Sequence, residues 1–180
     1  MTKKHRMKMY ATSVLWLFNI LFFPSQALSA DYGENVSAGG YISTNGIEMY
    51  YEIYGEGDPL VLIHGSGQSI KDMSHQIDGF KDRYQVIVAD SRAHGNSAMA
   101  ETQMTYRQMA ADWAGLIGAL TEKPVRIIGW SDGGNISLEL ARAYPSLINR
   151  LAVMGANLAP GEMAVYPWAV EWVLRESANI

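Results

Sequence analysis

A glycine-flanked serine constrains the fold of this chain more than any other feature of its sequence. Residues 129–133 read Gly-Trp-Ser-Asp-Gly, with an apolar β-prone run at 125–128 before them and a helical pattern after them. A tight turn from a strand into a helix holds such a serine in a strained backbone conformation with its hydroxyl exposed. Glycines flank the serine because side chains there would collide with neighbouring elements. The sequence therefore predicts Ser131 as a nucleophile, with Gly129 and Gly133 shaping its turn.

Two further polar loops follow directly after runs of apolar residues. Residues 60–63 and 84–89 are continuous β-prone runs, as expected for strands that are covered on both faces. The first ends at residues 64–67, His-Gly-Ser-Gly, and the second at residues 90–97, Asp-Ser-Arg-Ala-His-Gly-Asn-Ser. Ligands of parallel sheets bind beyond the carboxyl ends of the strands. The three polar loops are therefore predicted to meet at one end of the sheet.

The remaining pattern alternates strands with helices. Two β-prone runs within residues 41–54 flank an Asn-Gly pair, a strong hairpin signal. Thr105 and Gln108 form a capping box before an amphipathic helix, Pro145 ends the helix that follows the serine, and residues 147–154 resemble one more strand. This order predicts an α/β fold with a mostly parallel, doubly wound sheet and an N-terminal antiparallel hairpin.

The loops contain donors suited to acyl transfer. A serine nucleophile needs a base to take its proton and fixed donors for the oxyanion that develops. The backbone N–H of Asp132, at the start of a helix, and the N–H of Ser66 are the predicted donors. We interpret the Asp132 side chain as a local charge at the helix start.

Several nearby residues have more than one reading. His64 is either a general base or, as we favour, a residue that shapes the oxyanion loop together with Gly65. Asp90 is either a triad carboxylate or, as we favour, a partner of His94 in fixing its loop by hydrogen bonds. Trp130 either lines the substrate pocket or only covers the serine turn.

The order of these elements and loops resembles the α/β-hydrolase fold family, over about residues 40–159. Within that family, the chain is similar to small esterases, lactonases and cofactor-free haloperoxidase-like members. The resemblance implies that Ser131 is the nucleophile and that Ser66 and Asp132 supply the oxyanion donors. One departure is Ala93, where the family often has glycine, and we expect a single Cβ there to matter little.

A larger departure concerns the rest of the triad. The family places the acid and then the histidine after the nucleophile, yet no histidine follows Ser131 here. The resemblance therefore implies that this chain lacks both the acid and the base. If these 180 residues are the whole polypeptide, we expect weak hydrolytic turnover and an uncovered edge at the strand 147–154.

The N-terminus has the layout of a secretory signal peptide. Four Lys and Arg residues precede an apolar run at 14–23, and small residues follow up to Ala30. The run is about half of the roughly 20 residues that span a bilayer, so we expect cleavage after Ala27 or Ala30 and no stable membrane anchor. The expected organisation is a signal at 1–30, a flexible leader at 31–39, a hydrolase core at 40–159 and the start of a cap at 160–180.

Composition narrows the possible partners. All 18 Asp and Glu residues follow the expected signal, which itself contains four of the 14 Lys and Arg residues, so the mature surface is acidic and disfavours nucleic acid. The chain has no cysteine, which excludes disulfides, and export without them suits a periplasm or the medium. No cofactor or metal site is indicated.

The leading hypothesis is a secreted or periplasmic serine hydrolase that acts on a small-molecule ester, lactone or similar acyl bond. One alternative is a non-catalytic truncated binding protein or an inactive gene fragment. Another is a perhydrolase, which uses the same residues with peroxide as the acyl acceptor. The sequence indicates neither the substrate nor the oligomeric state.

Overall fold

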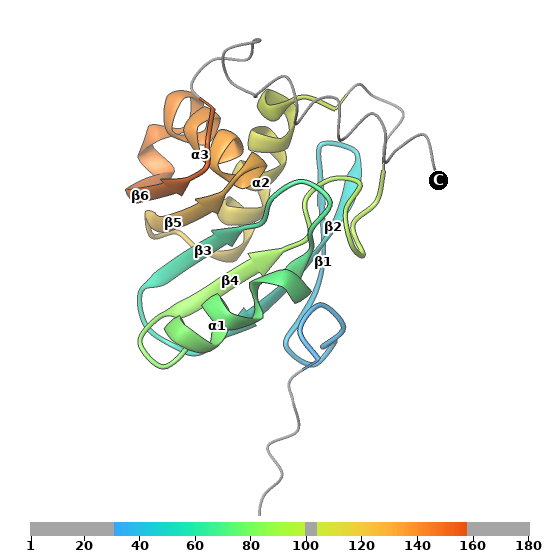
Figure 1. Ribbon diagram of the computed structural model, residues 1–180, viewed down its shortest axis with the longest axis vertical. Coiled ribbons are helices and arrows are strands. Elements are labelled where there is room, and N and C mark those ends of the chain that lie inside the picture. The colour runs from blue at the N-terminus through green and yellow to red at the C-terminus, as the bar shows by residue number, and fades with distance from the viewer. Residues whose placement is uncertain (1–30, 100–103, 158–180) are drawn as a thin grey trace, which may run out of the picture. The chain divides into compact units, whose positions relative to one another are not determined.

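A six-stranded sheet runs through the residues that the computed structural model describes, which are 31–99 and 104–157. The strand order is β1-β2-β4-β3-β5-β6, and all pairings among β3, β4, β5 and β6 are parallel (Figure 1). The pairings of β1 with β2 and of β2 with β4 are antiparallel. The bounds are β1 Gly39–Thr44, β2 Ile47–Tyr54, β3 Pro59–Ile63, β4 Gln85–Ala89, β5 Val125–Trp130 and β6 Ile148–Met154. The predicted α/β fold class is confirmed.

The hairpin that opens the sheet forms at the predicted Asn-Gly pair. Asn45 and Gly46 have φ angles of 44° and 77°, the positive values that a two-residue hairpin turn of type I′ requires at both positions. Thr44 then pairs with Ile47 across the turn. This register turns Ile47 and Met49 of β2 into the core.

Helices cover both faces of the sheet. Figure 1 shows α1 in front of the sheet and α2 and α3 behind it. Val61 and Ile63 of β3 share one buried cluster with Trp113 of α2, whereas the alternate residues Leu60 and Leu62 face the other side. The bounds are α1 Ser74–Phe80, α2 Tyr106–Leu120 and α3 Asp132–Ala143, with 3₁₀ turns η1 Ile70–Met73 and η2 Pro145–Leu147. The continuous apolar runs were therefore correctly interpreted as strands covered on both faces.

The predicted helix start at Thr105 is present in a modified form. The Thr105 side chain accepts a hydrogen bond from the backbone N–H of Gln108 at 3.1 Å. The Gln108 side chain donates to Asp112 Oδ1 at 3.2 Å. It therefore does not complete the capping box by bonding to the Thr105 backbone. Gln108 is drawn to Asp112 because that carboxylate is buried and accepts several donors.

A buried ion pair ties the loop after β4 to α2. Arg92 donates to Asp112 with two nitrogens, Nε to Oδ2 at 2.7 Å and Nη2 to Oδ1 at 2.8 Å. Both side chains are at most 2% exposed. Asn45 donates to Asp112 as well, at 3.1 Å, so the hairpin turn joins the same cluster. This geometry supplies the hydrogen bonds that a buried charge pair needs to offset its desolvation.

Residues 31–38 contact the domain closely, which differs from the flexible leader that we predicted for 31–39. Gly33 and Asn35 donate their backbone N–H groups to the Glu52 carboxylate at 2.9 and 2.7 Å. The Glu52 side chain is fully buried on β2. The segment is held because this buried carboxylate needs donors, and its polar composition gave no sign of that requirement.

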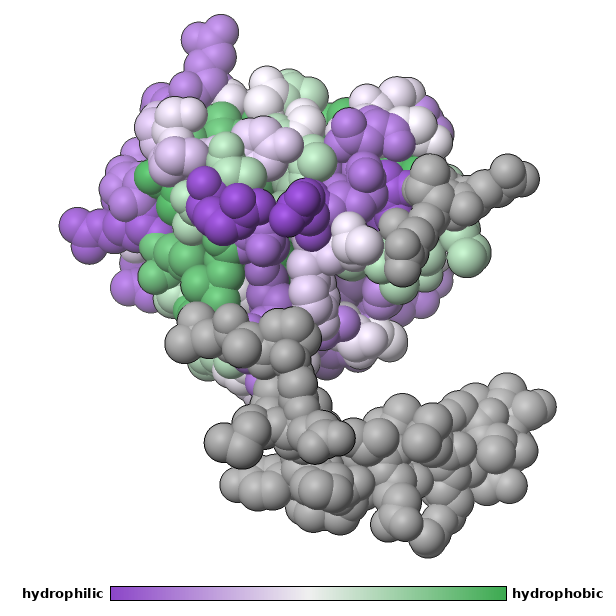
Figure 2. Space-filling view, turned by 90° about the horizontal axis from the view of Figure 1, so that it is seen from above, coloured by the Kyte–Doolittle hydropathy of each residue, from purple (hydrophilic) through white to green (hydrophobic). Residues whose placement is uncertain are grey.

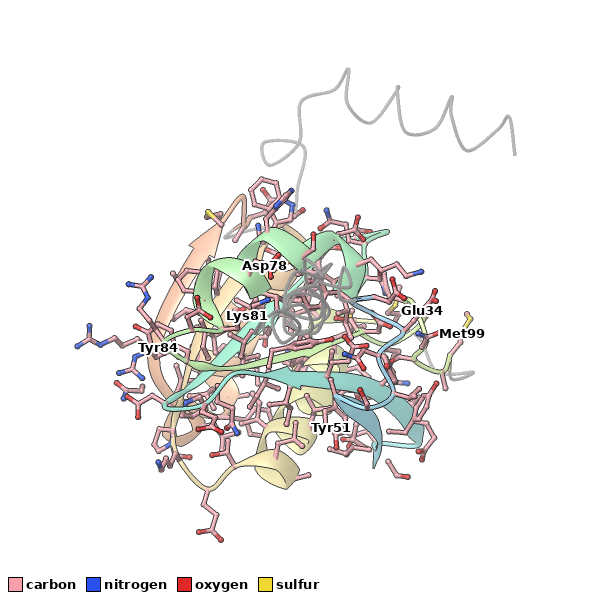
Figure 3. The ribbon with its side chains drawn as sticks, turned by 90° about the horizontal axis from the view of Figure 1, so that it is seen from below. Glu34, Tyr51, Asp78, Lys81, Tyr84 and Met99 are labelled. Atoms are coloured by element: carbon pink, nitrogen blue, oxygen red, sulfur yellow. The ribbon has the colours of Figure 1, made fainter. Side chains whose placement is uncertain are left out.

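Tyr32 adds a second attachment for the same segment. Its hydroxyl donates to Asp78 Oδ1 at 2.7 Å, and Lys81 donates to the Tyr32 oxygen at 3.0 Å. Asp78 lies on α1 and Lys81 directly follows the last residue of that helix, where the two side chains form an ion pair (Figure 3). The Tyr32 ring also meets Tyr54 edge to face, with centroids 4.9 Å apart. The segment therefore bridges β2 and α1.

Among the described residues, β6 lies at one edge of the sheet, and the uncovered edge expected at 147–154 falls on this strand. Val153 and Met154 are 38% and 46% exposed, although both are apolar. The strand begins at Ile148 because Pro145–Leu147 forms a 3₁₀ turn. The expected signal at 1–30 and the expected cap at 160–180 lie outside the described residues. Within 31–99 and 104–157, no helix is long and apolar enough to cross a membrane.

We expect Asp112→Ala to lower the free energy of unfolding by about 3–5 kcal/mol, because it leaves the Arg92 charge buried without this carboxylate. Urea denaturation followed by circular dichroism measures the change. The matched control is Glu139→Ala, which breaks the exposed pair of Glu139 with Arg142 and should cost less than about 1 kcal/mol. Equal losses in the two variants would contradict this account of the buried pair.

Candidate active site

Ser131 occupies a strained turn between β5 and α3. Its backbone has φ 53° and ψ −116°, a left-handed φ that residues with a side chain rarely adopt. The turn is held from both sides: the Ser131 N–H donates to the Met154 carbonyl at 2.8 Å, and its own carbonyl accepts from Gly134 at 2.8 Å. The predicted strand-to-helix turn is therefore present, and its strain is offset by hydrogen bonds to β6 and α3.

The glycines on either side of Ser131 allow this turn to pack. A Cβ on Gly129 would lie 2.4 Å from the Gly133 carbonyl oxygen, and a Cβ on Gly133 would lie 2.1 Å from the Ile63 carbonyl oxygen. Real Cβ atoms essentially never approach other atoms so closely. The first turn of α3 thus rests directly on the backbone at the carboxyl end of β3, as the pattern of glycines predicted.

The loop after β3 lies against the serine turn. A Cβ built on Gly65 would be 3.2 Å from Ser131 Cβ and 2.9 Å from Trp130 Cδ1. The Gly65 N–H is occupied by Gln68 Oε1 at 2.9 Å. The N–H groups of Ser66 and Asp132, by contrast, have no acceptor among the described residues. The structure therefore brings two of the predicted loops together and leaves the two expected donors available.

His64 is buried behind this loop with both ring nitrogens engaged. Its Nε2 accepts the backbone N–H of Ser91 at 2.9 Å, so Nδ1 carries the proton and donates to the Gly65 carbonyl at 2.8 Å. Burial lowers the pKa of His64 below the ordinary imidazole value. A neutral imidazole with both nitrogens occupied suits loop shaping, the reading that we favoured for His64.

The loop after β4 is fixed by Asp90 and His94. The Asp90 carboxylate accepts backbone N–H bonds from Ile70 at 2.8 Å and from Asn96 at 2.7 Å. His94 Nε2 accepts the N–H of Gly67 at 3.2 Å. Both side chains therefore join the loops after β3 and β4, which matches the interpretation that Asp90 fixes its loop rather than acting as a triad acid.

Ala93 corrects one expectation about this loop. Its φ is 61°, in the left-handed region where an L side chain meets the following carbonyl. The expectation that one Cβ would matter little is therefore wrong. An alanine in this conformation costs roughly 1–2 kcal/mol relative to an unstrained backbone, a cost that glycine avoids.

Two aromatic side chains flank the serine turn. The Tyr106 hydroxyl of α2 donates to Asp132 Oδ1 at 2.6 Å, and burial together with this bond raises the pKa of Tyr106. Sequence reasoning missed this contact because the two residues are 26 positions apart. Trp130 is 46% exposed and lies against Gly65, so its predicted role in lining a pocket stays a prediction.

The surface of the described residues is mixed in character. Figure 2 shows strongly hydrophilic side chains next to a hydrophobic patch on the face seen from above. Several large apolar or aromatic side chains among the described residues are also exposed: Met99, Met104, Tyr106 and Trp130. Among residues 31–99 and 104–157, no cluster of three or more His, Asp or Glu residues is placed to hold a metal ion.

Among the described residues, no histidine side chain is hydrogen-bonded to Ser131, Ser66 or Asp132. His75 lies exposed on α1, and His5 falls outside the described residues. His64 and His94 bind backbone groups through their ring nitrogens. The part of the chain that the structure describes thus contains a serine and two backbone donors. The imidazoles of His64 and His94 bind backbone groups of the loops instead.

Comparison with known proteins assigns this fold and turn to a family. Residues 58–174 match the family model described as alpha/beta hydrolase fold, and the chain therefore belongs to the α/β-hydrolase family. The human serine hydrolase BPHL is 32% identical over 142 residues, covering 74% of this chain and 48% of its own length. A (E)-2-((N-methylformamido)methylene)succinate hydrolase from Acinetobacter baylyi is 38% identical over 116 residues, covering 63% and 43%.

Solved structures give the same assignment. A thermophilic esterase from Thermogutta terrifontis superposes with a TM-score of 0.64 at 30% identity, covering 74% of this chain and 49% of its own. An esterase from Exiguobacterium antarcticum superposes with a TM-score of 0.70 at 25% identity, covering 78% and 56%. The chain spans about half the length of the curated relatives that it matches. These relatives are named as hydrolases or esterases, and this chain aligns with part of each.

We expect Gly133→Ala to destabilise the fold strongly, because the new Cβ would collide with the Ile63 carbonyl oxygen. The loss should exceed about 2 kcal/mol, as for other overpacked core sites. Gly118→Ala on α2 is the matched control, since a Cβ there meets nothing within 4 Å and alanine favours a helix by about 1 kcal/mol. Thermal unfolding of both variants tests the contact, and an unchanged melting temperature for Gly133→Ala would contradict it.

Proposed function

We propose that this protein is a serine hydrolase that cleaves an ester, lactone or similar acyl bond of a small molecule with Ser131 as the nucleophile. One observation carries the proposal. A serine with a left-handed φ of 53° stands at the start of α3, next to two backbone N–H groups that have no acceptor among the described residues. Backbone donors fixed in advance around a serine are what stabilisation of an acyl-transfer transition state requires.

The proposed chemistry assigns each group one step. Ser131 Oγ attacks the carbonyl carbon and loses its proton to a base, and the carbonyl oxygen becomes an oxyanion. The N–H groups of Ser66 and Asp132 donate to that oxyanion. The intermediate then expels the alcohol, which takes up the proton, and leaves an acyl-serine. Water attacks this ester in the same way and releases the acid.

We further propose that the base and its acid partner come from polypeptide outside these 180 residues. Support comes from His64 and His94, whose ring nitrogens bind backbone groups. The relatives are about twice as long as the part that this chain matches, which leaves room for both residues. The family includes relatives named as esterases, as an epoxide hydrolase and as other hydrolases, so the acyl substrate is proposed from the site and not from the family.

Labelling with a fluorophosphonate probe tests the nucleophile. In the full-length protein we expect one labelled serine, with Ser131→Ala abolishing the label because the reactive hydroxyl is gone. The matched control is Ser146→Ala, which removes an exposed serine from η2 and should leave labelling intact. Peptide mass spectrometry locates the adduct. A folded protein that is not labelled at Ser131 would support the non-catalytic alternative, and faster reaction with peroxide than with water would support the perhydrolase.

We also propose that the protein is exported and that residues 1–30 act as a cleaved signal. The basic residues before the apolar run 14–23 support this. The contacts of Tyr32 with Asp78 and Lys81 favour cleavage upstream of Tyr32, after Ala27 or Ala30, because both sites keep that residue. Fractionation of the source cells with mass spectrometry of the N-terminus measures this. An intact Met1 on protein recovered from the cytoplasm would contradict it.

A further inference from the structure

Two imidazoles connect the loop after β3, which contains Ser66, with the loop after β4. His64 follows β3, and its Nε2 accepts the N–H of Ser91 in the loop after β4 at 2.9 Å. His94 belongs to the loop after β4, and its Nε2 accepts the N–H of Gly67 in the loop after β3 at 3.2 Å. The ring centroids lie 5.1 Å apart. Each loop thus holds the other through a histidine.

The second nitrogen of His94 sets its protonation state. Nδ1 lies 2.9 Å from the Arg92 carbonyl oxygen, which can only accept a hydrogen bond. Nδ1 therefore carries the hydrogen, and Nε2 is the unprotonated nitrogen that accepts from Gly67. The bond to Gly67 exists only while the ring is neutral, because a protonated imidazole has a donor at both nitrogens.

We propose that His94 is a positioning residue for the oxyanion site: it holds the Ser66–Gly67 turn through the Gly67 N–H, and protonation of its ring releases that turn. The inference rests on the proposed function for the role of Ser66. The hydrogen bond between His94 and Gly67 stands independently of that function.

The turn depends on hydrogen bonds because little packs against it. Ser66 and Gly67 are both exposed, and a Cβ on Gly67 would meet nothing within 4 Å. Gly67 has φ 67°, so the chain reverses there immediately after the Ser66 donor. A 3.3 Å bond from Gln68 N–H to the Gly65 carbonyl spans the turn internally, and His94 connects it to the next loop. Loss of that connection leaves the direction of the Ser66 N–H less well fixed.

The charged groups around His94 are already engaged. Asp90 accepts two backbone N–H bonds, and Arg92 is paired with Asp112. In η1, Asp72 accepts from the Ser69 backbone at 2.8 Å, and Lys71 is paired with Glu34. His64 on the facing loop is only 2% exposed, and burial lowers its pKa below the ordinary imidazole value. His94 is half-buried and is therefore the more accessible of the two imidazoles.

Nuclear magnetic resonance of the ¹⁵N-labelled full-length protein tests the connection without any assay of activity. We expect the Gly67 amide resonance to move with pH as the His94 ring titrates. In His94→Gln the resonance should be flat, because the glutamine oxygen accepts the same N–H and does not titrate. The matched control is His75→Gln, which removes an exposed imidazole from α1 and should leave the Gly67 titration as in the wild type.

Ester hydrolysis by the full-length protein tests the positioning role. We expect His94→Ala to lower kcat about tenfold while KM changes less than about twofold, since oxyanion contacts act mainly in the transition state. His94→Gln should restore kcat to within about threefold of the wild type. On the acid side, the dependence of kcat on pH in His94→Gln should then reflect only titrating groups at other positions.

Two results would overturn the inference: a Gly67 resonance that still titrates in His94→Gln, or a wild-type kcat in His94→Ala. Failure of the proposed function is distinguishable from both. If the wild type hydrolyses no ester, the role of Ser66 fails, while the Gly67 titration still decides whether His94 holds the turn.

Discussion

The contact between the first turn of α3 and the carboxyl end of β3 is the constraint on which the site depends. A Cβ on Gly133 would lie 2.1 Å from the Ile63 carbonyl oxygen, so the two backbones meet with no side chain between them. This approach places the start of α3 beside the loop after β3. It also forces the chain to reverse sharply at Ser131, and the left-handed φ of 53° is the result. The serine and both proposed donors follow from one close backbone contact.

Buried and half-buried polar groups hold the loops around that contact. Asp90, His64 and His94 each accept backbone N–H groups across the gap between the loops after β3 and β4. The pair of Arg92 with Asp112 then fixes the second of these loops to α2. In the reaction that we propose, a rigid scaffold of this kind keeps the two donor N–H groups in place before substrate arrives, which lowers the reorganisation that the reaction requires.

Sequence patterns predicted the strands, the hairpin and the serine turn because apolar runs, an Asn-Gly pair and paired glycines each have one dominant structural cause. Local patterns of this kind do not indicate a buried charge, so the two buried carboxylates were not predicted. Asp112 lies within the apolar face of α2, and Glu52 lies on an alternating strand, yet both are fully buried. Only partners distant in sequence explain them: Arg92 for Asp112, and the backbone of residues 33–35 for Glu52. The folded leader and the contact of Tyr106 with Asp132 were missed in the same way.

A crystal structure of the full-length protein with a phosphonate ester bound at the serine measures the central claim most directly. The phosphonyl oxygen has the position and charge of the oxyanion in acyl transfer. The account predicts a covalent bond from Ser131 Oγ to phosphorus, with that oxygen within hydrogen-bond distance of the N–H groups of both Ser66 and Asp132. A phosphonate on another residue, or an oxygen turned away from both N–H groups, would contradict it.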